Sequence, residues 1–148
     1  MKKDKPYMVD ILFILGSESD RERMQIAFDL AEEKGLSWDC RIYSAHRNLK
    51  ELIAFLEETR GTFRSVIAAA GLSAALPGVV ASLTDVPVLG VPLEVGSLSG
   101  LDALLSILQL PKGTPVATMG IGKQGILNAV HLAERIVRNP AGIGSHRE

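Results

Sequence analysis

Three short polar segments each follow an apolar run, and each could bind an anionic ligand. The first spans residues 16–20 and contains Gly16, Ser17, Ser19 and Asp20. Backbone N–H groups at a helix start favour an anion such as phosphate. Ser17 could donate to that phosphate, and Asp20 could accept from a ribose hydroxyl or an amine. Helix capping is the competing interpretation, because Ser19 and Glu22 stand at the spacing of a capping box. The residue types leave both interpretations open.

The second segment offers an acid–base group beside a cation. It consists of Ser44, Ala45, His46 and Arg47. Histidine titrates near neutral pH, which makes His46 the natural proton-transfer candidate. Arg47 is expected to open the second helix, where its charge opposes the helix dipole and a bound phosphate would remove the conflict. A surface His–Arg pair without a catalytic role is the alternative. His131, expected inside the last helix, and His146, in the tail, are poorer candidates.

The third segment is rich in small residues. It contains Gly71, Leu72, Ser73 and Ala74 and leads into a Leu-Pro-Gly sequence. Small residues at the end of a strand let a ligand approach the backbone closely. Tight packing of a helix on a sheet would explain the same composition. Two further glycine-rich stretches, 96–100 and 120–125, are expected to form pocket walls or subunit contacts.

The elements that must position these segments alternate between strand and helix five times. Strands are predicted over 9–15, 38–42, 65–70, 86–91 and 116–119, and helices over 19–34, 47–60, 76–83, 101–110 and 126–137. This alternation is typical of an α/β protein with a doubly wound parallel sheet covered by helices on both faces. The strand at 38–42 alternates apolar and polar residues and is expected to be less covered than the first. Ligands of such sheets bind outside the carboxyl ends of the strands, where the three polar segments fall.

Length and charge narrow the class of protein. A chain of 148 residues predicts a single domain, with its core over about 9–138 and a loose tail over 139–148. The net charge is −1 and no block of lysine or arginine is present, so we expect no nucleic-acid partner. Glycine, serine and proline residues interrupt the apolar stretch 66–83, so no membrane span is expected.

Cysteine and histidine usage argues against a metal site. Cys40 is the only cysteine and there are three scattered histidines, and none of the common metal-ligand spacings is present. A single thiol cannot form an internal disulfide, which is typical of a reducing compartment and predicts a cytoplasmic protein.

The motifs together resemble one enzyme family. GSESD at 16–20, SAHR at 44–47 and the run from 86 to 129 are similar to the carboxyaminoimidazole ribonucleotide mutases, also called aminoimidazole ribonucleotide carboxylase catalytic subunits. The likeness runs in order from about Val9 to Val137. It implies a flavodoxin-like, three-layer fold with a five-stranded parallel sheet, a homo-octamer whose sites use more than one subunit, and no cofactor.

The resemblance also implies a reaction of purine biosynthesis. The family moves a carboxyl group from the exocyclic nitrogen of the ribonucleotide to a ring carbon by releasing carbon dioxide and recapturing it. By position, a buried His46 would carry the proton. Gly71, Leu72, Ser73 and Ala74 would shape the carbon dioxide pocket. The ribonucleotide would contact Ser17, Asp20 and Arg47, with Gly16, Ser19, Ser44 and Ala45 beside them.

The third segment departs from the family pattern. Bacterial mutases usually read GGAAHLPGM there, whereas this chain has Leu72 in place of a glycine and Ala75 in place of the histidine. Animal-type carboxylases, which use free carbon dioxide, also lack that histidine but carry lysine where Arg47 stands. Three functions are therefore carried forward: the mutase, a direct carboxylase of aminoimidazole ribonucleotide or of a pyridinium-type nucleotide, and a non-catalytic nucleotide-binding or assembly protein.

Overall fold

The computed structural model describes residues 8–139, which form five strands and five helices. The strands are β1 (Val9–Leu15), β2 (Trp38–Ile42), β3 (Phe63–Ala70), β4 (Val88–Pro92) and β5 (Ala117–Thr118). The helices are α1 (Asp20–Glu33), α2 (Leu49–Glu58), α3 (Leu76–Leu83), α4 (Leu101–Leu108) and α5 (Lys123–Arg138). Strand and helix alternate throughout, as predicted.

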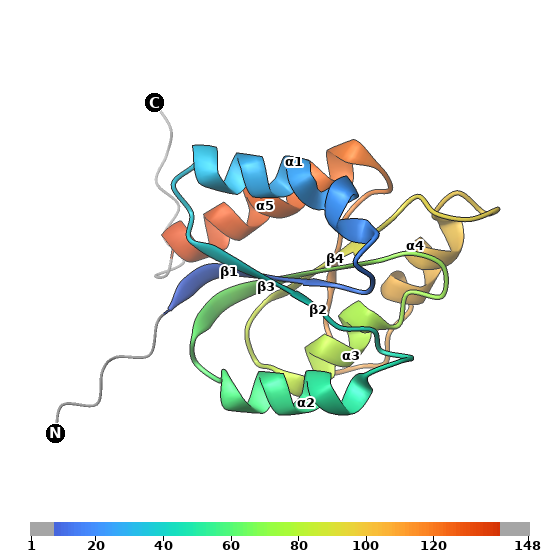
Figure 1. The fold of residues 1–148 in the computed structure, drawn as a ribbon, viewed down its shortest axis with the longest axis horizontal. Helices are drawn as coiled ribbons and strands as arrows, with labels where there is room; N and C mark the ends of the chain where they lie inside the picture. The colour runs from blue at the N-terminus through green and yellow to red at the C-terminus, as the bar shows by residue number, and fades with distance from the viewer. Residues whose placement is uncertain (1–7, 140–148) are drawn as a thin grey trace, which may run out of the picture.

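The five strands form one parallel sheet in the order β2-β1-β3-β4-β5 (Figure 1). The chain moves outward from β1 to β2 and then crosses to β3 on the other side of β1, so the switch point lies between β1 and β3. In flavodoxin-like sheets of this order, ligands bind at that point. The topology therefore directs attention to the loops that follow β1 and β3.

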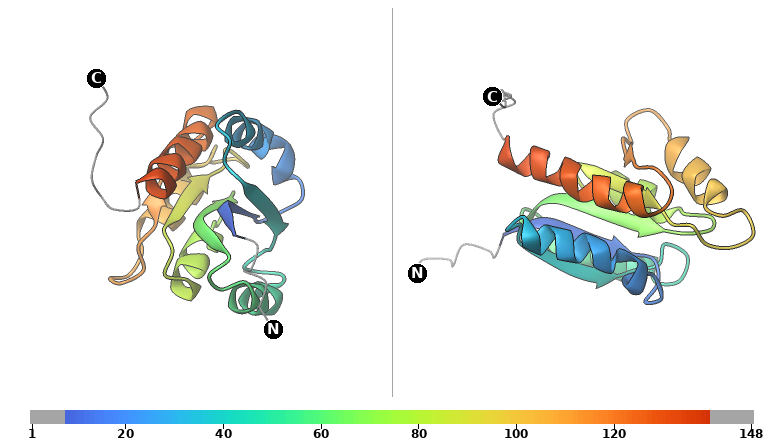
Figure 2. Two further views of the ribbon diagram at one scale, coloured as in Figure 1. Left: turned by 90° about the vertical axis from the view of Figure 1, so that its left-hand side faces the viewer. Right: turned by 90° about the horizontal axis from the view of Figure 1, so that it is seen from above.

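Helices cover both faces of the sheet and make three layers (Figure 2). On one face, α1 and α5 pack on alternate residues of the central strands, including Ile11, Phe13 and Ile67. On the other face, α2, α3 and α4 pack on the intervening residues, including Leu12 and Val66. β1 and β3 are buried on both faces over most of their length, which is why residues 11–15 and 66–70 are continuous apolar runs rather than alternating ones.

An aromatic cluster closes the sheet beneath α1. The Phe28 ring of α1 stacks on the Trp38 ring of β2, with centroids 4.6 Å apart, and Phe13 meets Phe28 edge-on at 5.0 Å. Such pairs stabilise beyond the area that they bury, by roughly 0.5–1.5 kcal/mol. The cluster fixes α1 over the edge strand and so holds the loop that precedes this helix.

The boundaries depart from the predicted ones at several ends. β4 begins and ends later than the predicted strand at 86–91, and β5 has two residues where four were predicted. α4 ends at Leu108 rather than at 110, and α2 ends at Glu58. Leu49 belongs to the predicted apolar stripe of α2 yet is 39% exposed. These differences amount to a few residues at the ends of helices and strands, where boundaries are least sharply defined.

The structure describes too little of the C-terminus to test the predicted tail, but it does bear on the question of a membrane span. The predicted loose tail and His146 fall almost wholly outside residues 8–139, so they remain predictions. Between Met8 and Asn139, no helix is long and apolar enough to cross a membrane.

Candidate active site

A cavity of about 440 Å³ opens at the carboxyl ends of the strands. These strand ends and the loops that follow them lie toward the right-hand side of Figure 1. Its walls come from the loops after β1, β2, β3 and β4, and it includes the β1/β3 switch point. The lining residues are Gly16, Ser17, Ser19, Asp20, Ser44, Ala45, His46, Arg47, Ala70, Gly71, Leu72, Ser73, Ala74, Ala75, Leu76 and Val95. All twelve residues that the sequence placed in a site therefore line one cavity.

The first loop is held at its base by the sheet. The backbone N–H of Gly16 donates to the carbonyl of Ala69 at 3.1 Å, which extends the β1–β3 pairing by one residue. Ser19 occupies the N-cap position of α1, but its backbone is already helical and its side chain makes no capping bond. Its hydroxyl instead pairs with the Ser17 hydroxyl, with 2.9 Å between the two oxygens.

The capping-box prediction for Ser19 is therefore wrong. The helical backbone of Ser19 brings its hydroxyl to Ser17 and not to the N–H groups of the first turn of α1. The two hydroxyls stay at the cavity wall. They can serve a ligand as a pair, and one can donate while the other accepts.

Asp20 is the first residue of α1 and is only 6% exposed. Burial raises the pKa of its carboxyl above 3.8, while the charge of Arg23 and a hydrogen bond from the Ser17 backbone act in the opposite direction. Asp20 is the only carboxylate among the described residues that line the cavity. A largely buried acceptor beside a helix start suits a neutral donor such as a hydroxyl or an amine.

The second loop continues from β2 and turns back toward α2. The N–H of Tyr43 donates to the Leu15 carbonyl at 2.9 Å, and the Ser44 N–H donates to Oδ1 of Asn48 at 2.6 Å. The turn is completed by the His46 N–H, which donates to Ser44 Oγ at 3.3 Å. These bonds place the His46 and Arg47 side chains at the cavity wall.

Two predictions for this loop need correction. His46 was expected to be buried, but it is exposed, because it lies in a turn that follows the edge strand β2. Arg47 was expected to open the second helix, but α2 begins two residues later at Leu49 with Asn48 as its N-cap. Arg47 makes no ion pair with any residue between 8 and 139, and it is the only lysine or arginine in the described cavity wall.

The third loop leaves β3 at the centre of the sheet. Ala74 is buried, whereas Leu72 and Ser73 are exposed at the cavity wall. Leu72 has a backbone φ of +57°, a left-handed conformation that non-glycine residues seldom adopt. The loop after β4 lies beside it, since the Leu93 N–H donates to the Ala70 carbonyl at 3.0 Å.

Val95 is a cavity residue that the sequence interpretation did not name. It follows β4, and the rule that ligands bind at carboxyl ends of strands could have suggested it only once β4 was known to lie beside β3. The two glycine-rich stretches 96–100 and 120–125 do not line this cavity. Of the two alternatives predicted for these stretches, the pocket wall does not apply to this cavity, and a role in subunit contacts stays a prediction.

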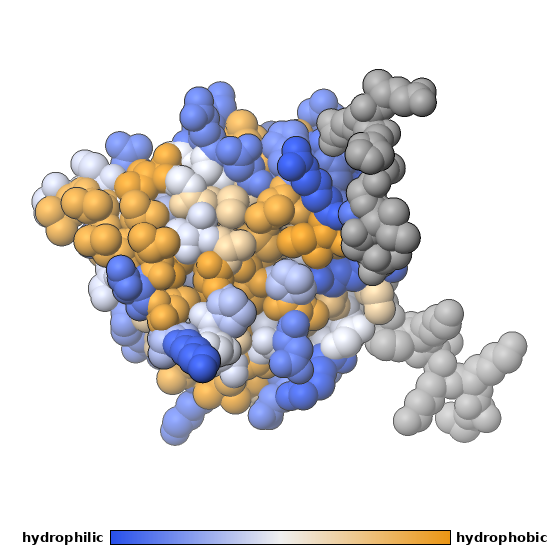
Figure 3. Space-filling view, turned by 180° about the vertical axis from the view of Figure 1, so that it is seen from behind, coloured by the Kyte–Doolittle hydropathy of each residue, from blue (hydrophilic) through white to orange (hydrophobic). Residues whose placement is uncertain are grey.

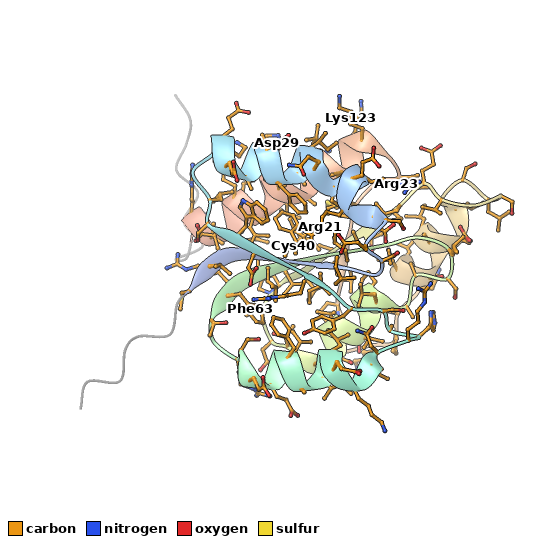
Figure 4. All side chains as sticks on the ribbon, viewed as in Figure 1. Arg21, Arg23, Asp29, Cys40, Phe63 and Lys123 are labelled. Atoms are coloured by element: carbon orange, nitrogen blue, oxygen red, sulfur yellow. The ribbon has the colours of Figure 1, made fainter. Side chains whose placement is uncertain are left out.

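The arrangement favours proton transfer on a bound anion over nucleophilic chemistry. Cys40 lies on β2 away from the cavity wall, next to Arg21 of α1 (Figure 4), and burial raises the pKa of its thiol, which favours the unreactive protonated form. Within residues 8–139 no three histidine, cysteine, aspartate or glutamate residues come together as metal ligands would. The fold and site thus define a doubly wound α/β protein with a pocket of about 440 Å³ at its switch point, where a histidine, an arginine and an aspartate meet.

Comparison with known proteins names the particular family. The AIR carboxylase family model matches residues 10–141, and the chain belongs to this family. N5-carboxyaminoimidazole ribonucleotide mutase of Brucella melitensis is 47% identical over 130 residues, which are 87% of this chain and 80% of that protein. The mutase of Escherichia coli is 42% identical over 128 residues, or 86% of this chain and 76% of the relative.

Solved structures agree on the fold. The PurE protein of Treponema denticola superimposes with a TM-score of 0.64 at 21% identity, over 91% of this chain and 98% of the other. A variant of the PurE2 protein from the same organism has a TM-score of 0.68 at 20% identity, with the same coverage. The predicted flavodoxin-like, three-layer fold is confirmed.

Proposed function

We propose that this protein is an N5-carboxyaminoimidazole ribonucleotide mutase of purine biosynthesis. The observation that carries the proposal is one cavity that brings His46 and Arg47 together with Ser17 and Asp20, in a member of the AIR carboxylase family whose curated relatives are mutases. The reaction converts N5-carboxyaminoimidazole ribonucleotide to 4-carboxy-5-aminoimidazole ribonucleotide. It needs proton transfer and carboxyl retention, and the proposal assigns both to side chains of this chain.

The ribonucleotide binds through its charged and hydroxylated end. Arg47, free of ion pairs among the described residues, binds the phosphate, and the Ser17–Ser19 hydroxyl pair adds donors at the start of α1. Asp20 accepts from a ribose hydroxyl. The imidazole base then lies toward the third loop, against Gly71 and Ala74.

The reaction balances with one proton held by His46. Protonated His46 donates to the exocyclic nitrogen while the carbamate C–N bond breaks, and carbon dioxide and the free amine form. The ring carbon then attacks carbon dioxide and forms the new C–C bond. Neutral His46 removes the proton from that ring carbon, which restores both the aromatic ring and the imidazolium. No proton is gained or lost overall.

The proposal includes the assembly of the protein. The chain forms a cytoplasmic homo-octamer, and its subunits meet beside the cavity. Leu101, Leu105 and Leu108 form an apolar stripe along α4 and are 50–55% exposed, and Leu98 in the preceding loop is 58% exposed. Figure 3 shows apolar side chains gathered over this part of the molecule. Exposed apolar clusters of this kind are typical of subunit contacts, and this one begins two residues after Gly96, beside the third loop.

The replacement His46→Asn tests the assigned chemistry. It keeps a polar side chain but removes the titrating group, so kcat with freshly made carbamate is expected to fall at least ~100-fold while the affinity for aminoimidazole ribonucleotide stays within about threefold. Absorbance of the carboxylated imidazole measures turnover, and calorimetry measures binding. His131→Asn, on the exposed face of α5, is the matched control and should retain full activity.

Assays with two different substrates distinguish the mutase from the alternative functions. Conversion of the carbamate without ATP, faster than its spontaneous decay, supports the proposal. Conversion only of aminoimidazole ribonucleotide with bicarbonate would instead make the protein a direct carboxylase, the reading favoured by Ala75 in the cavity wall. Tight nucleotide binding with no turnover in either arm would select the non-catalytic alternative, and full activity of His46→Asn would remove His46 from the chemistry.

A further inference from the structure

The turn that carries His46 and Arg47 is closed at its two ends by hydrogen bonds between Ser44 and Asn48. The Ser44 N–H donates to Asn48 Oδ1 at 2.6 Å, and the Asn48 N–H donates back to the Ser44 carbonyl at 3.1 Å. Inside this ring the His46 N–H donates to Ser44 Oγ at 3.3 Å. Between residues 8 and 139 the side chains of His46 and Arg47 make no hydrogen bond or ion pair of their own, so the backbone of this turn determines their position.

The Ser44 N–H needs a partner because of its place at the edge of the sheet. β2 is an outermost strand with β1 as its neighbour, and the N–H of Tyr43 points inward, to the Leu15 carbonyl at 2.9 Å. Successive N–H groups of an extended chain point to opposite sides, so the Ser44 N–H points away from β1, where no described strand can accept from it. A half-buried N–H without a partner is costly. The Asn48 side chain supplies the acceptor.

Asn48 forgoes another hydrogen bond in this arrangement. It is the N-cap of α2, a position where an asparagine side chain ordinarily accepts from the N–H groups of the first helical turn. Its side chain makes no such bond, because its oxygen is turned back to Ser44. Helix capping therefore does not explain this orientation. Asn48 does not line the cavity either, so any effect on the reaction must pass through the turn that it closes.

We propose that Asn48 is a positioning residue for the reaction and acts through His46. Its side-chain oxygen keeps the turn closed, and the closed turn holds His46 at the wall of the cavity. The inference rests on the proposed mutase function, in which His46 moves one proton between two substrate atoms. Such a transfer needs the imidazole within hydrogen-bond reach of both atoms, so a loosened turn lowers kcat. An acceptor oxygen is what the position requires, and asparagine is one of several residues that supply it.

Variants with and without an acceptor oxygen test this role. Asn48→Leu keeps the size of the side chain but has no acceptor, so kcat at saturating carbamate is expected to fall about tenfold. Asn48→Asp and Asn48→Thr each keep an oxygen and should stay within about threefold of wild type. Thr84→Val is the matched control. The Thr84 hydroxyl accepts from the Val86 N–H at 3.3 Å in the loop before β4, away from the cavity, and its loss should leave kcat unchanged.

Hydrogen exchange and a double variant separate positioning from general stability. The peptide covering residues 43–48 should exchange faster in Asn48→Leu than in wild type, whereas peptides from α1 and α5 should be unchanged. In a His46→Asn background, Asn48→Leu should lower the residual kcat less than about twofold, because the group that it positions is gone. A tenfold loss in both backgrounds would give Asn48 a structural role and overturn the proposal.

The outcomes also distinguish this proposal from the proposed function. If wild type does not turn over the carbamate, the mutase function is overturned and the role of Asn48 falls with it. If wild type is active and Asn48→Leu keeps its kcat, the function stands and only the role of Asn48 is overturned. Equal losses in the leucine, aspartate and threonine variants would overturn it as well, since the acceptor oxygen would not be what the position supplies.

Discussion

Asp20 combines two requirements that conflict at neutral pH. In its proposed role as an acceptor for the ribose it serves best when ionised, yet it is 6% exposed and burial raises its pKa above 3.8. A carboxyl whose folded-state pKa exceeds its unfolded value binds its proton more tightly in the folded state. The folded state therefore loses stability as pH rises through the interval above 3.8, and the loss is complete once both states are ionised.

The replacement Asp20→Asn should remove this loss. We expect a higher urea midpoint than wild type at pH 7, and a difference that shrinks as the pH is lowered toward 4. Affinity for aminoimidazole ribonucleotide should move the other way and fall about tenfold, because the amide is a weaker acceptor toward the ribose. Urea titrations at pH 7, 5.5 and 4 check the first effect. The exposed Asp85→Asn variant is the control, and a pH-independent difference would contradict the assignment.

At the scale of elements, α1 and α5 are joined by an ion-pair cluster at the end of the sheet remote from the cavity. Glu134 of α5 meets Nζ of Lys34, the C-cap of α1, and a guanidinium nitrogen of Arg138, each at 2.7 Å. Arg138 also donates to the Lys34 carbonyl, so the last turn of α1 is satisfied by a side chain of α5. The hydrogen bond from Lys34 lowers the pKa of Glu134 below 4.5, and Glu134 is only 16% exposed.

The replacement Glu134→Gln should destabilise the protein in a pH-dependent way. A lowered folded-state pKa contributes stability above pH 4.5 that is lost as the pH falls through the folded value. We expect the unfolding free energy at pH 7 to fall by about 1 kcal/mol. The difference between the variant and wild type should shrink as the pH is lowered from 7 to 3, since protonation removes the ion pair. Chemical denaturation at both pH values measures this, with the exposed Glu33→Gln as the control; an equal difference at both would rule out the ion pair as the cause.

For the whole molecule, the exposed leucine face of α4 is the feature that a single chain leaves unexplained. The same helix buries Ala103 and Ile107 against the sheet while Leu105 stays 51% exposed, so α4 is apolar on two sides. A helix that is apolar on more than one side is typical of a buried position. A second copy of the chain provides that burial in the proposed assembly.

The replacement Leu105→Glu should therefore weaken assembly. A charge in the centre of the stripe would have to be desolvated in the contact, so the molar mass from light scattering should drop below that of wild type at equal concentration. Far-UV circular dichroism should be unchanged, because Leu105 faces away from the core. Leu49→Glu, at another exposed leucine on α2, is the control and should keep the wild-type mass. An unchanged mass for Leu105→Glu would place the contact elsewhere.

Sequence patterns predicted those features whose physical cause lies within a few neighbouring residues. Continuous apolar runs identified the central strands, and Gly35, with a φ of +67°, stops α1 as its position predicted. Short elements were predicted less well, since two residues of β5 carry too little periodicity to mark their ends. The exposure of His46, the burial of Asp20 and the position of Val95 had no sequence signal of their own.

The sequence by itself determined the strand–helix alternation, the three polar segments and the family, because these depend on residue type and spacing along the chain. Only the tertiary structure decided the strand order, and with it which loops share a cavity. It also decided that Leu72 lies on Gly96 and that Val95 lies against Gly71. The physical reason is that burial and contact depend on which distant segment packs alongside, and strand pairing between β1, β3 and β4 settles that choice.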